Sequence, residues 1–339
     1  MNAMNYLAHT RLMAGMQVIH LRFYIRALET LIFGDQPGSA IRGAIYGVLA
    51  RDFCSEEALR STREHQAVCP VCRLLAAEDE QAGRGRNIAR PLAVEPPLGR
   101  PHYGPGAELS FGVSLIGWAE STIPYIIRAV MAAGKVGIGA GRGRYQLVGV
   151  SEYCPLGGEQ RTLLEGRVVK RPALAVGAMA VENAAREYDP AQVRLQLLTP
   201  MRLTAGGSLV KRPEPVAFVQ RLLERCQNLA EHYATVEPGV EPVRREQWVA
   251  AYHELVNIAG QAAIVEDATL WMEARSGSRR QGRFTEIGGL VGGVTWSGPL
   301  GPLLPWLLWG QSLHVGKDAV KGNGWYQVQN ARPVEASNK

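Results

Sequence analysis

The sequence predicts an α+β chain made of two tandem domains of one design. Residues 112–147 and 293–328 superpose without a gap after a shift of 181 positions, with glycines and a proline-led apolar segment in register. Both halves also show strand-like alternation and helix-like spacing in the same order. The 339 residues are about twice the usual domain length. A repeat this long indicates two domains and excludes a solenoid of short units.

The first half opens with a strand and a helix. Apolar and polar residues alternate over positions 18–27, so one face of this strand is apolar. After a turn at 34–38, Ser39 can cap a helix that runs to about Ala50. The half then closes with a strand over 108–117, a helix led by Pro124, a glycine-rich loop over 137–144 and a strand from Tyr145.

The second half repeats this order. Its predicted elements are a strand over 193–198, a helix over 216–233, a strand over 290–298, a helix led by Pro305, a glycine-rich loop over 316–324 and a strand from Tyr326. One more connecting strand is needed in each half, and in the second half we place it near 275–287. Each half then forms a β-α-β-β-α-β unit, the ferredoxin-like arrangement.

These elements divide the chain into three parts. We expect an N-terminal domain over 16–150, with a cysteine-containing insertion at about 54–102. A structured connector covers 151–190, and a C-terminal domain covers 191–335.

Composition excludes several classes of protein. No apolar run approaches the roughly 20 residues of a membrane span, and the N-terminus lacks a signal core, so we expect no membrane partner. Five cysteines, an odd number, do not indicate a disulfide framework and suit a reducing compartment, which predicts a cytoplasmic protein. The net charge is +6. Basic residues gather in and near the glycine-rich loops, where freed backbone amides and fixed cations can hold phosphates.

The insertion contains a metal-binding pattern. Cys69-Pro70-Val71-Cys72 can place two thiolates on one tetrahedral ion, and Cys54 and His65 can supply the other two ligands. This pattern predicts a structural zinc that takes no part in chemistry. Three reduced, partly buried thiols are the alternative.

Several motifs carry a resemblance to a known family. In the second half they are residues 288–292 (GGLVG), Leu304-Pro305, 314–317 (HVGK) and 322–326 (GNGWY). In the first half they are 115–119 (LIGWA) and 137–145 (GIGAGRGRY), and 199–203 (TPMRL) follows the first strand of the second half. With the paired glycine-rich loops, the chain resembles the RAMP superfamily of CRISPR-associated proteins from about residue 18 to 330. Its C-terminal part is similar to the endoribonucleases that process CRISPR repeat RNA.

The resemblance implies metal-independent cleavage of precursor crRNA, in which the ribose 2′-hydroxyl attacks the adjacent phosphate and leaves a 2′,3′-cyclic phosphate. Such cleavage needs no cofactor but needs a proton acceptor, a proton donor and a cation. His314 is our candidate acid or base and Lys317 the cation beside it. His20, on the polar face of the first strand, is expected to be solvated or structural. Many family members have a catalytic histidine in the first helix, where this chain has Arg42 and Tyr46 instead.

The expected RNA contacts lie in both glycine-rich loops and in the segment before the second repeat, where arginines can form paired hydrogen bonds with phosphate or guanine. The candidate residues are Lys135, Arg142, Arg144, Arg275, Arg279, Arg280, Gln281, Lys321, Gly322 and Gly324. For each basic cluster, a solvated loop is the alternative.

Three functions therefore stay open. The first is an endoribonuclease that cuts CRISPR repeat RNA. The second is a RAMP subunit without activity that binds guide RNA beside other effector subunits, which the missing first-helix histidine favours. The third is an RNA-binding scaffold unrelated to CRISPR.

Overall fold

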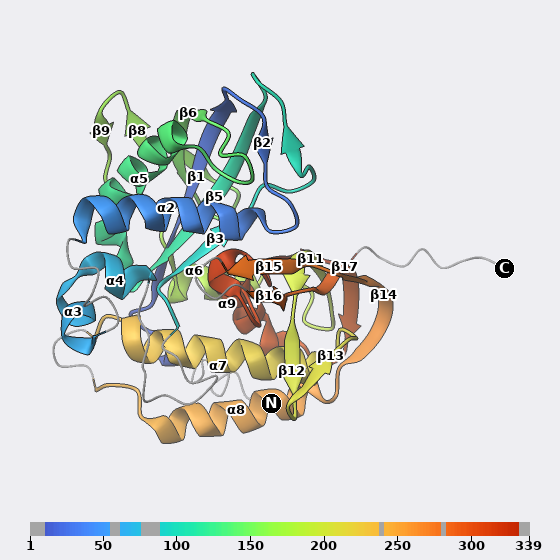
Figure 1. Ribbon diagram of the computed structural model, residues 1–339. Coiled ribbons are helices and arrows are strands. Elements are labelled where there is room, and N and C mark those ends of the chain that lie inside the picture. Colours follow the sequence, from blue (N-terminus) through green and yellow to red (C-terminus); the bar gives the residue numbers. More distant parts are fainter. Residues whose placement is uncertain (1–10, 55–61, 76–88, 237–240, 279–282, 332–339) are drawn as a thin grey trace.

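The computed structural model describes residues 11–54, 62–75, 89–236, 241–278 and 283–331. Two antiparallel sheets, one from each half of the chain, lie side by side, and each carries helices on one face (Figure 1). None of the described helices is long and apolar enough to cross a membrane.

The first sheet has the strand order β3-β5-β1-β6-β7, and β10 also pairs with β1. Its strands are β1 (Gln17–Ala27), β3 (Leu92–Glu95), β5 (Glu108–Ile116), β6 (Tyr145–Tyr153), β7 (Gln160–Thr162) and β10 (Val176–Gly177). Helices α2 (Pro37–Phe53) and α5 (Ile123–Val136) pack on it and on each other. Proline at the start of each helix fits the first turn, where no backbone donor is needed.

The second sheet has the strand order β14-β17-β11-β18. Its strands are β11 (Gln192–Met201), β14 (Ala263–Met272), β17 (Gly289–Ser297) and β18 (Tyr326–Asn330), and its helices are α7 (Pro215–Tyr233), α8 (Arg245–Ala259) and α9 (Leu304–Leu313). The strand order matches that of β3, β5, β1 and β6 in the first sheet. The predicted fold class, two tandem ferredoxin-like domains, is confirmed.

Short strand pairs and short helices lie around the two sheets. Short hairpins are β8 (Leu164–Glu165) with β9 (Val168–Val169), β12 (Leu203–Ala205) with β13 (Ser208–Val210), and β15 (Arg275–Ser278) with β16 (Arg283–Glu286). The strands β2 (Leu31–Ile32) and β4 (His102–Tyr103), which are distant in sequence, also form a two-stranded antiparallel pair. Short helices are α3 (Arg63–Val68), α4 (Pro70–Leu75), α6 (Ala178–Ala185), and the 3-10 turns η1 (Arg11–Met13), η3 (Gly117–Thr122), η4 (Gly301–Leu303) and η5 (Ala319–Lys321).

One predicted element was wrong. The connecting strand of the second half is β14 and not the segment near 275–287, which instead folds back on itself as the β15–β16 hairpin. Nearly every side chain of β14 is exposed or half-exposed, so the strand lacks the apolar alternation that marks a half-buried strand in sequence. β14 is an edge strand that pairs only with β17, and the side chains on both of its faces are left largely uncovered.

The two halves share part of one core. The N-terminal end of β1, through Val18, and the end of β5, through Ile116, belong to the same buried apolar cluster as α7 and α9. The connector also adds to the first half, since β7 pairs with β6 and β10 pairs with β1. The predicted boundaries at 150 and 190 remain a proposal.

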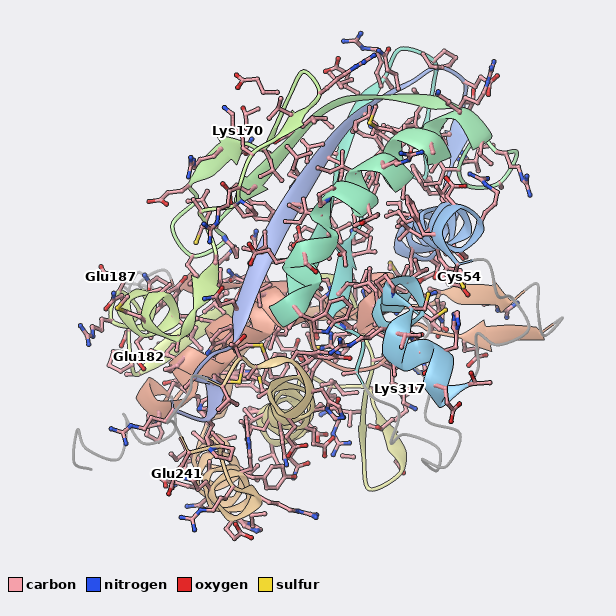
Figure 2. All side chains as sticks on the ribbon, turned by 90° about the vertical axis from the view of Figure 1, so that its left-hand side faces the viewer. Cys54, Lys170, Glu182, Glu187, Glu241 and Lys317 are labelled. Atoms are coloured by element: carbon pink, nitrogen blue, oxygen red, sulfur yellow. The ribbon has the colours of Figure 1, made fainter. Side chains whose placement is uncertain are left out.

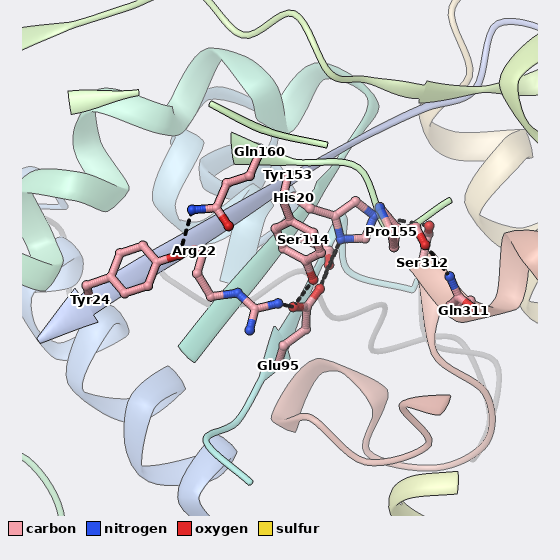
Figure 3. A network of polar contacts seen from close by, with 10 residues as sticks. All are labelled: His20, Arg22, Tyr24, Glu95, Ser114, Tyr153, Pro155, Gln160, Gln311 and Ser312. Atoms are coloured by element: carbon pink, nitrogen blue, oxygen red, sulfur yellow. Dashed lines mark hydrogen bonds and ion pairs between the residues drawn. The ribbon is translucent and has the colours of Figure 1, made fainter. Parts of the chain in front are cut away.

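A buried polar network also joins the halves (Figure 3). His20 on β1 contacts Glu95 of β3 through Nδ1 at 2.9 Å and Ser312 of α9 through Nε2 at 3.0 Å. Ser114, Arg22 and Tyr153 complete the shell of hydrogen bonds around the Glu95 carboxylate. His20 is 1% exposed, so it is structural and not solvated as one reading of the sequence expected.

Candidate nucleic-acid site

A cavity of about 490 Å³ lies where the first helix of the N-terminal half meets the glycine-rich loop of the C-terminal half. Its lining residues are Arg42, Tyr46, Leu75, Arg90, Arg225, Gly316, Asp318, Ala319, Val320 and Lys321. We call this space the α2–loop cavity. Residues separated by nearly the whole chain thus meet in one place.

Close backbone packing builds this cavity. A Cβ placed on Gly38, near the start of α2, would lie 2.0 Å from the carbonyl oxygen of Lys321. A Cβ on Gly322 would lie 2.8 Å from the carbonyl oxygen of Val94 in β3. Both positions therefore need glycine to let the loop approach the N-terminal half.

The cavity lining is strongly basic. Arg42, Arg90, Arg225 and Lys321 contribute cations, and Asp318 is the single carboxylate in the lining. Asp318 is already paired with Lys321 at 2.8 Å. The remaining positive charge in a concave, partly enclosed space favours an anionic ligand.

Two predicted residues of α2 line the cavity. Arg42 and Tyr46 lie one turn apart on the same helix, and both are half-buried. One guanidinium nitrogen of Arg42, Nη2, donates to the carbonyl oxygen of Leu75 at 2.6 Å. This bond ties Arg42 to the end of α4 and fixes the side chain at the cavity wall.

The backbone amides of the C-terminal loop are hydrogen-bonded within the protein, contrary to the prediction from the sequence. We expected amides freed by glycine to hold phosphate. Instead Lys317 donates to Arg202, Lys321 and Asn323 donate to Asp318, Gly322 donates to Ala319, and Gly324 donates to Pro200. These amides are used inside the protein, so a phosphate at this loop would have to be held by side chains and not by these amides. Gly322 and Gly324 shape the loop through their positive φ angles of 94° and 69°.

His314 lies behind this loop and not in the cavity lining. Its ring is fully buried and stacks on Trp325 at 6.1 Å between centroids. The ring interacts with the Asn323 backbone, but neither ring nitrogen has a partner at normal hydrogen-bond geometry among the described residues. Burial lowers the pKa of His314 to about 3, so the ring is neutral. Its φ of 61° and ψ of 157° fall in a region that residues other than glycine rarely adopt.

The other predicted basic residues lie outside the cavity lining. Lys317 is exposed on the loop beside it. Lys135 and Arg142 are exposed at the first glycine-rich loop, and Arg144 there pairs with Glu29 at 2.7 Å. Arg275 is exposed on β15. Arg279, Arg280 and Gln281 lie outside the described residues.

Sequence reasoning missed three residues near this site. Arg90 and Arg225 line the cavity from segments that carry no family motif. Trp271 on β14 lies near two cations, with the Arg202 guanidinium at 5.9 Å and the Lys211 ammonium at 5.7 Å from the ring centroid. Arg202 belongs to the 199–203 motif, and this motif was the one feature of the sequence that could have pointed to Trp271 and its two cations.

The predicted metal ligands converge. The ligand atoms of Cys54, His65, Cys69 and Cys72 all lie within 4.8 Å of one another. The Sγ atoms of Cys54 and Cys72 are 3.7 Å apart, and Cys54 Sγ lies 3.3 Å from His65 Nε2. Zinc–sulfur bonds of about 2.3 Å at tetrahedral angles place two sulfurs about 3.8 Å apart, so the donor set fits that ion. Cys54 directly follows α2, near α3 and α4 (Figure 2).

Comparisons with known proteins agree with this architecture. Residues 195–326 match the family model described as CRISPR-associated endoribonuclease Cas6, and residues 16–174 match a model described as an N-terminal domain. No curated protein matches the chain by sequence.

Solved structures share the fold at low identity. A Cas6 product complex is 14% identical and has a TM-score of 0.55, with 92% of this chain and 100% of that chain covered. Cas6 of Thermus thermophilus is 13% identical at a TM-score of 0.50, with 93% and 99% covered. The Partial Cas6-RT-Cas1--Cas2 complex contains a chain that is 13% identical at a TM-score of 0.54, with 94% of this chain and 47% of that chain covered.

The two ferredoxin-like domains, each with a glycine-rich loop after its last helix, are the architecture that the resemblance to RAMP proteins implied. The resemblance seen in the sequence is thereby confirmed. Residues 195–326 are the part of the chain that is similar to the CRISPR-associated endoribonuclease Cas6 family.

Proposed function

We propose that this protein is a metal-independent endoribonuclease that binds CRISPR repeat RNA and cuts precursor crRNA into guide RNAs. The observation that supports this best is the α2–loop cavity, in which Arg42 and Tyr46 face the Cas6 domain's glycine-rich loop. Its surplus of positive charge suits the scissile phosphate. A cavity formed by both halves would bind RNA only when the two domains are correctly assembled.

Cleavage in this cavity needs only side chains. The 2′-hydroxyl attacks the phosphorus, the bond to the 5′ oxygen breaks, and the products are a 2′,3′-cyclic phosphate and a 5′-hydroxyl. Arg42 and Lys321 stabilise the charge on the phosphorane. Tyr46 is the one phenol in the lining and is our candidate for proton transfer to or from the reacting oxygens.

His314 and Lys317 remain part of the proposed catalytic set. Lys317 is exposed and can reach a phosphate at the cavity entrance. His314 can act only if the loop opens, because its ring is fully buried. Its unusual backbone angles and its poorly satisfied ring nitrogens both cost free energy in the closed loop, and such costs are found at functional sites. RNA binding would offset them by drawing the loop outward.

The RNA outside the cavity would follow the basic residues of the surface. We propose contacts to Lys135, Arg142, Arg144 and Arg275, and also to Arg279, Arg280 and Gln281. Exposed arginine and lysine side chains bind phosphates without reading sequence, while single-stranded bases give specificity. A cytoplasmic location and association with other CRISPR effector subunits also remain proposals; one structural relative is described as a Cas6 product complex and another as part of a complex with Cas1 and Cas2.

The direct test is incubation of the purified protein with labelled repeat RNA in EDTA, beside the same RNA with a 2′-deoxy sugar at the cut site. We expect cleavage of the first RNA only, with a cyclic phosphate at the new end. Cleavage of both RNAs, or cleavage that needs a divalent ion, would contradict the proposed mechanism.

A second candidate function is a RAMP subunit that binds guide RNA without cutting it. It is favoured by the first helix, in which Arg42 and Tyr46 stand where many family members place a histidine, and by the buried state of His314. Tight binding of the repeat RNA with no cleavage in the same assay would establish this alternative.

We also propose that Cys54, His65, Cys69 and Cys72 hold a structural zinc ion. The ligand set closes a tetrahedron and leaves no open position for water or substrate, which is typical of structural sites. Elemental analysis should give one zinc per chain, and Cys69→Ser should lose it. A fully folded protein without metal, at unchanged melting temperature, would support three reduced thiols instead.

A further inference from the structure

The guanidinium of Arg225, on α7, has one nitrogen that is hydrogen-bonded and another that has no partner among the described residues. Its Nε donates to the carbonyl oxygen of Leu313 at 2.6 Å, at the end of α9. Its Nη2 is buried and has no hydrogen-bond partner within the described part of the chain. The side chain also lines the α2–loop cavity.

No acidic group neutralises this guanidinium in the described structure. The groups that act on it electrostatically are the Cys226 thiol and the Tyr233 phenol, and burial raises the pKa of each to about 12. Both are therefore neutral near pH 7. Burial lowers the pKa of Arg225 to about 10, so the arginine itself stays charged at that pH.

A buried cation with an unused donor is costly in a folded protein. Proteins keep such groups when a ligand completes them. The nearest acid in the cavity lining, Asp318, is already paired with Lys321 at 2.8 Å. An anion that enters the cavity is then the available partner for Arg225.

We infer that Arg225 binds a phosphate group of the RNA backbone inside the α2–loop cavity. This inference rests on the proposed function and names one more contact for the same site. Guanidinium matches phosphate geometry through two parallel hydrogen bonds. Arg225 already lines the cavity, so a phosphate there can complete the unused Nη2 donor while Nε keeps its bond to Leu313.

The position of Arg225 also links the phosphate to the candidate loop. Leu313 directly precedes His314, so the Arg225–Leu313 bond holds the end of α9 where the loop begins. Arg225 would therefore place the phosphate next to the loop that carries Lys317 and Lys321.

The test uses Arg225→Gln and Arg225→Lys in the full chain, with Arg221→Gln as the matched control. Arg221 lies about one turn earlier on α7, pairs with Glu224 at 2.5 Å and is not in the cavity lining. Affinity for uncleavable 2′-deoxy repeat RNA is measured between low and high salt. Melting temperatures of all variants exclude simple unfolding.

We expect Arg225→Gln to reduce the slope of log affinity against log salt by about 0.7 to 0.9, the change for one lost phosphate contact. Affinity should fall about 10-fold at low salt, and Arg225→Lys should recover only part of it. Arg221→Gln should leave the slope unchanged. An unchanged slope in a folded Arg225→Gln protein that still binds RNA would overturn the inference and leave the proposed function standing.

A second measurement separates the inference about Arg225 from the proposed function. Inorganic pyrophosphate should raise the melting temperature of the wild-type protein and not that of Arg225→Gln. If the wild type binds no repeat RNA, the proposed function fails, and this shift still decides the role of Arg225. Equal shifts in both proteins would overturn it.

Discussion

Gly38 and Lys321 touch backbone to backbone, so closely that a Cβ on Gly38 would lie 2.0 Å from the Lys321 carbonyl oxygen. One residue begins the first helix, and the other ends the turn that precedes Gly322 in the C-terminal loop. This contact brings Arg42 and Tyr46 to the glycine-rich loop of the C-terminal half. The cavity therefore depends on how tightly the two halves pack.

Gly38→Ala should destabilise the protein by about 1–3 kcal/mol, because backbone must move to admit the methyl group. The melting temperature should fall by a few degrees, and affinity for repeat RNA should fall with it. Gly43→Ala in the same helix is the control, since nothing lies within 4 Å of a Cβ there. That change should be neutral or stabilising by up to about 1 kcal/mol. Equal melting temperatures for both variants would show that the contact is unimportant.

Tyr46→Phe tests the role of the phenol in cleavage. If Tyr46 transfers a proton, single-turnover cleavage should slow by about 100-fold or more, with little change in affinity for 2′-deoxy RNA. Tyr125→Phe, on α5 and 49% exposed, should behave as wild type. A normal rate for Tyr46→Phe would move proton transfer to His314 or to another group.

Glu95 gives stability a specific dependence on pH. Burial alone would raise its pKa, but the hydrogen bond and charge of His20, with Arg22 and Tyr153, lower it to about 2 from an ordinary 4.5. The unfolded chain therefore binds a proton at a higher pH than the folded one. Stability from Glu95 is complete above about pH 4.5 and is lost as the pH falls towards 2.

Urea unfolding at a series of pH values measures this effect. Glu95→Gln should lower stability near pH 7 by roughly 3 kcal/mol and flatten the profile between about pH 5 and 2. The variant weakens the hold of Glu95 on His20, the residue that joins β1 to α9 through Ser312, so RNA cleavage should weaken as well. A profile as steep as that of the wild type would assign the acid sensitivity to other carboxylates.

Loss of the proposed zinc should affect the proposed RNA site through one hydrogen bond. The ligands Cys69 and Cys72 lie before and within α4, and the Leu75 carbonyl at the end of α4 accepts a hydrogen bond from Arg42 at 2.6 Å. Cys72→Ser should remove zinc, lower the melting temperature by several degrees and weaken RNA binding. Cys226→Ser, at a buried cysteine outside the cluster, controls for loss of a thiol. If the metal-free protein bound RNA with unchanged affinity, the zinc site would have no influence on the RNA site.

Much of the fold could be predicted from periodic patterns in the sequence. The 181-residue repeat corresponds to β5, α5 and β6 in one half and β17, α9 and β18 in the other. The segment of β14 escaped prediction because an exposed edge strand has no apolar alternation. Apolar alternation in the sequence identifies half-buried helices and strands. It does not reveal strands that are stabilised mainly by backbone pairing.

The candidate site was predictable only in part. Arg42, Tyr46 and Lys321 were identified by their places in helix and loop, and the structure brings them together. Arg90 and Arg225 were missed because no local motif marks a residue that reaches a cavity from a distant segment. The burial of His314 and His20 was also hidden, since it depends on packing between the halves.

The most direct test of this account is photocrosslinking of full-length protein to repeat RNA that carries 4-thiouridine beside the cut site, with the linked peptides identified by mass spectrometry. The account predicts crosslinks in α2 around Tyr46 and in the loop over residues 316–324. Crosslinks confined to other surfaces, with neither segment labelled, would contradict the claim that the α2–loop cavity holds the scissile phosphate.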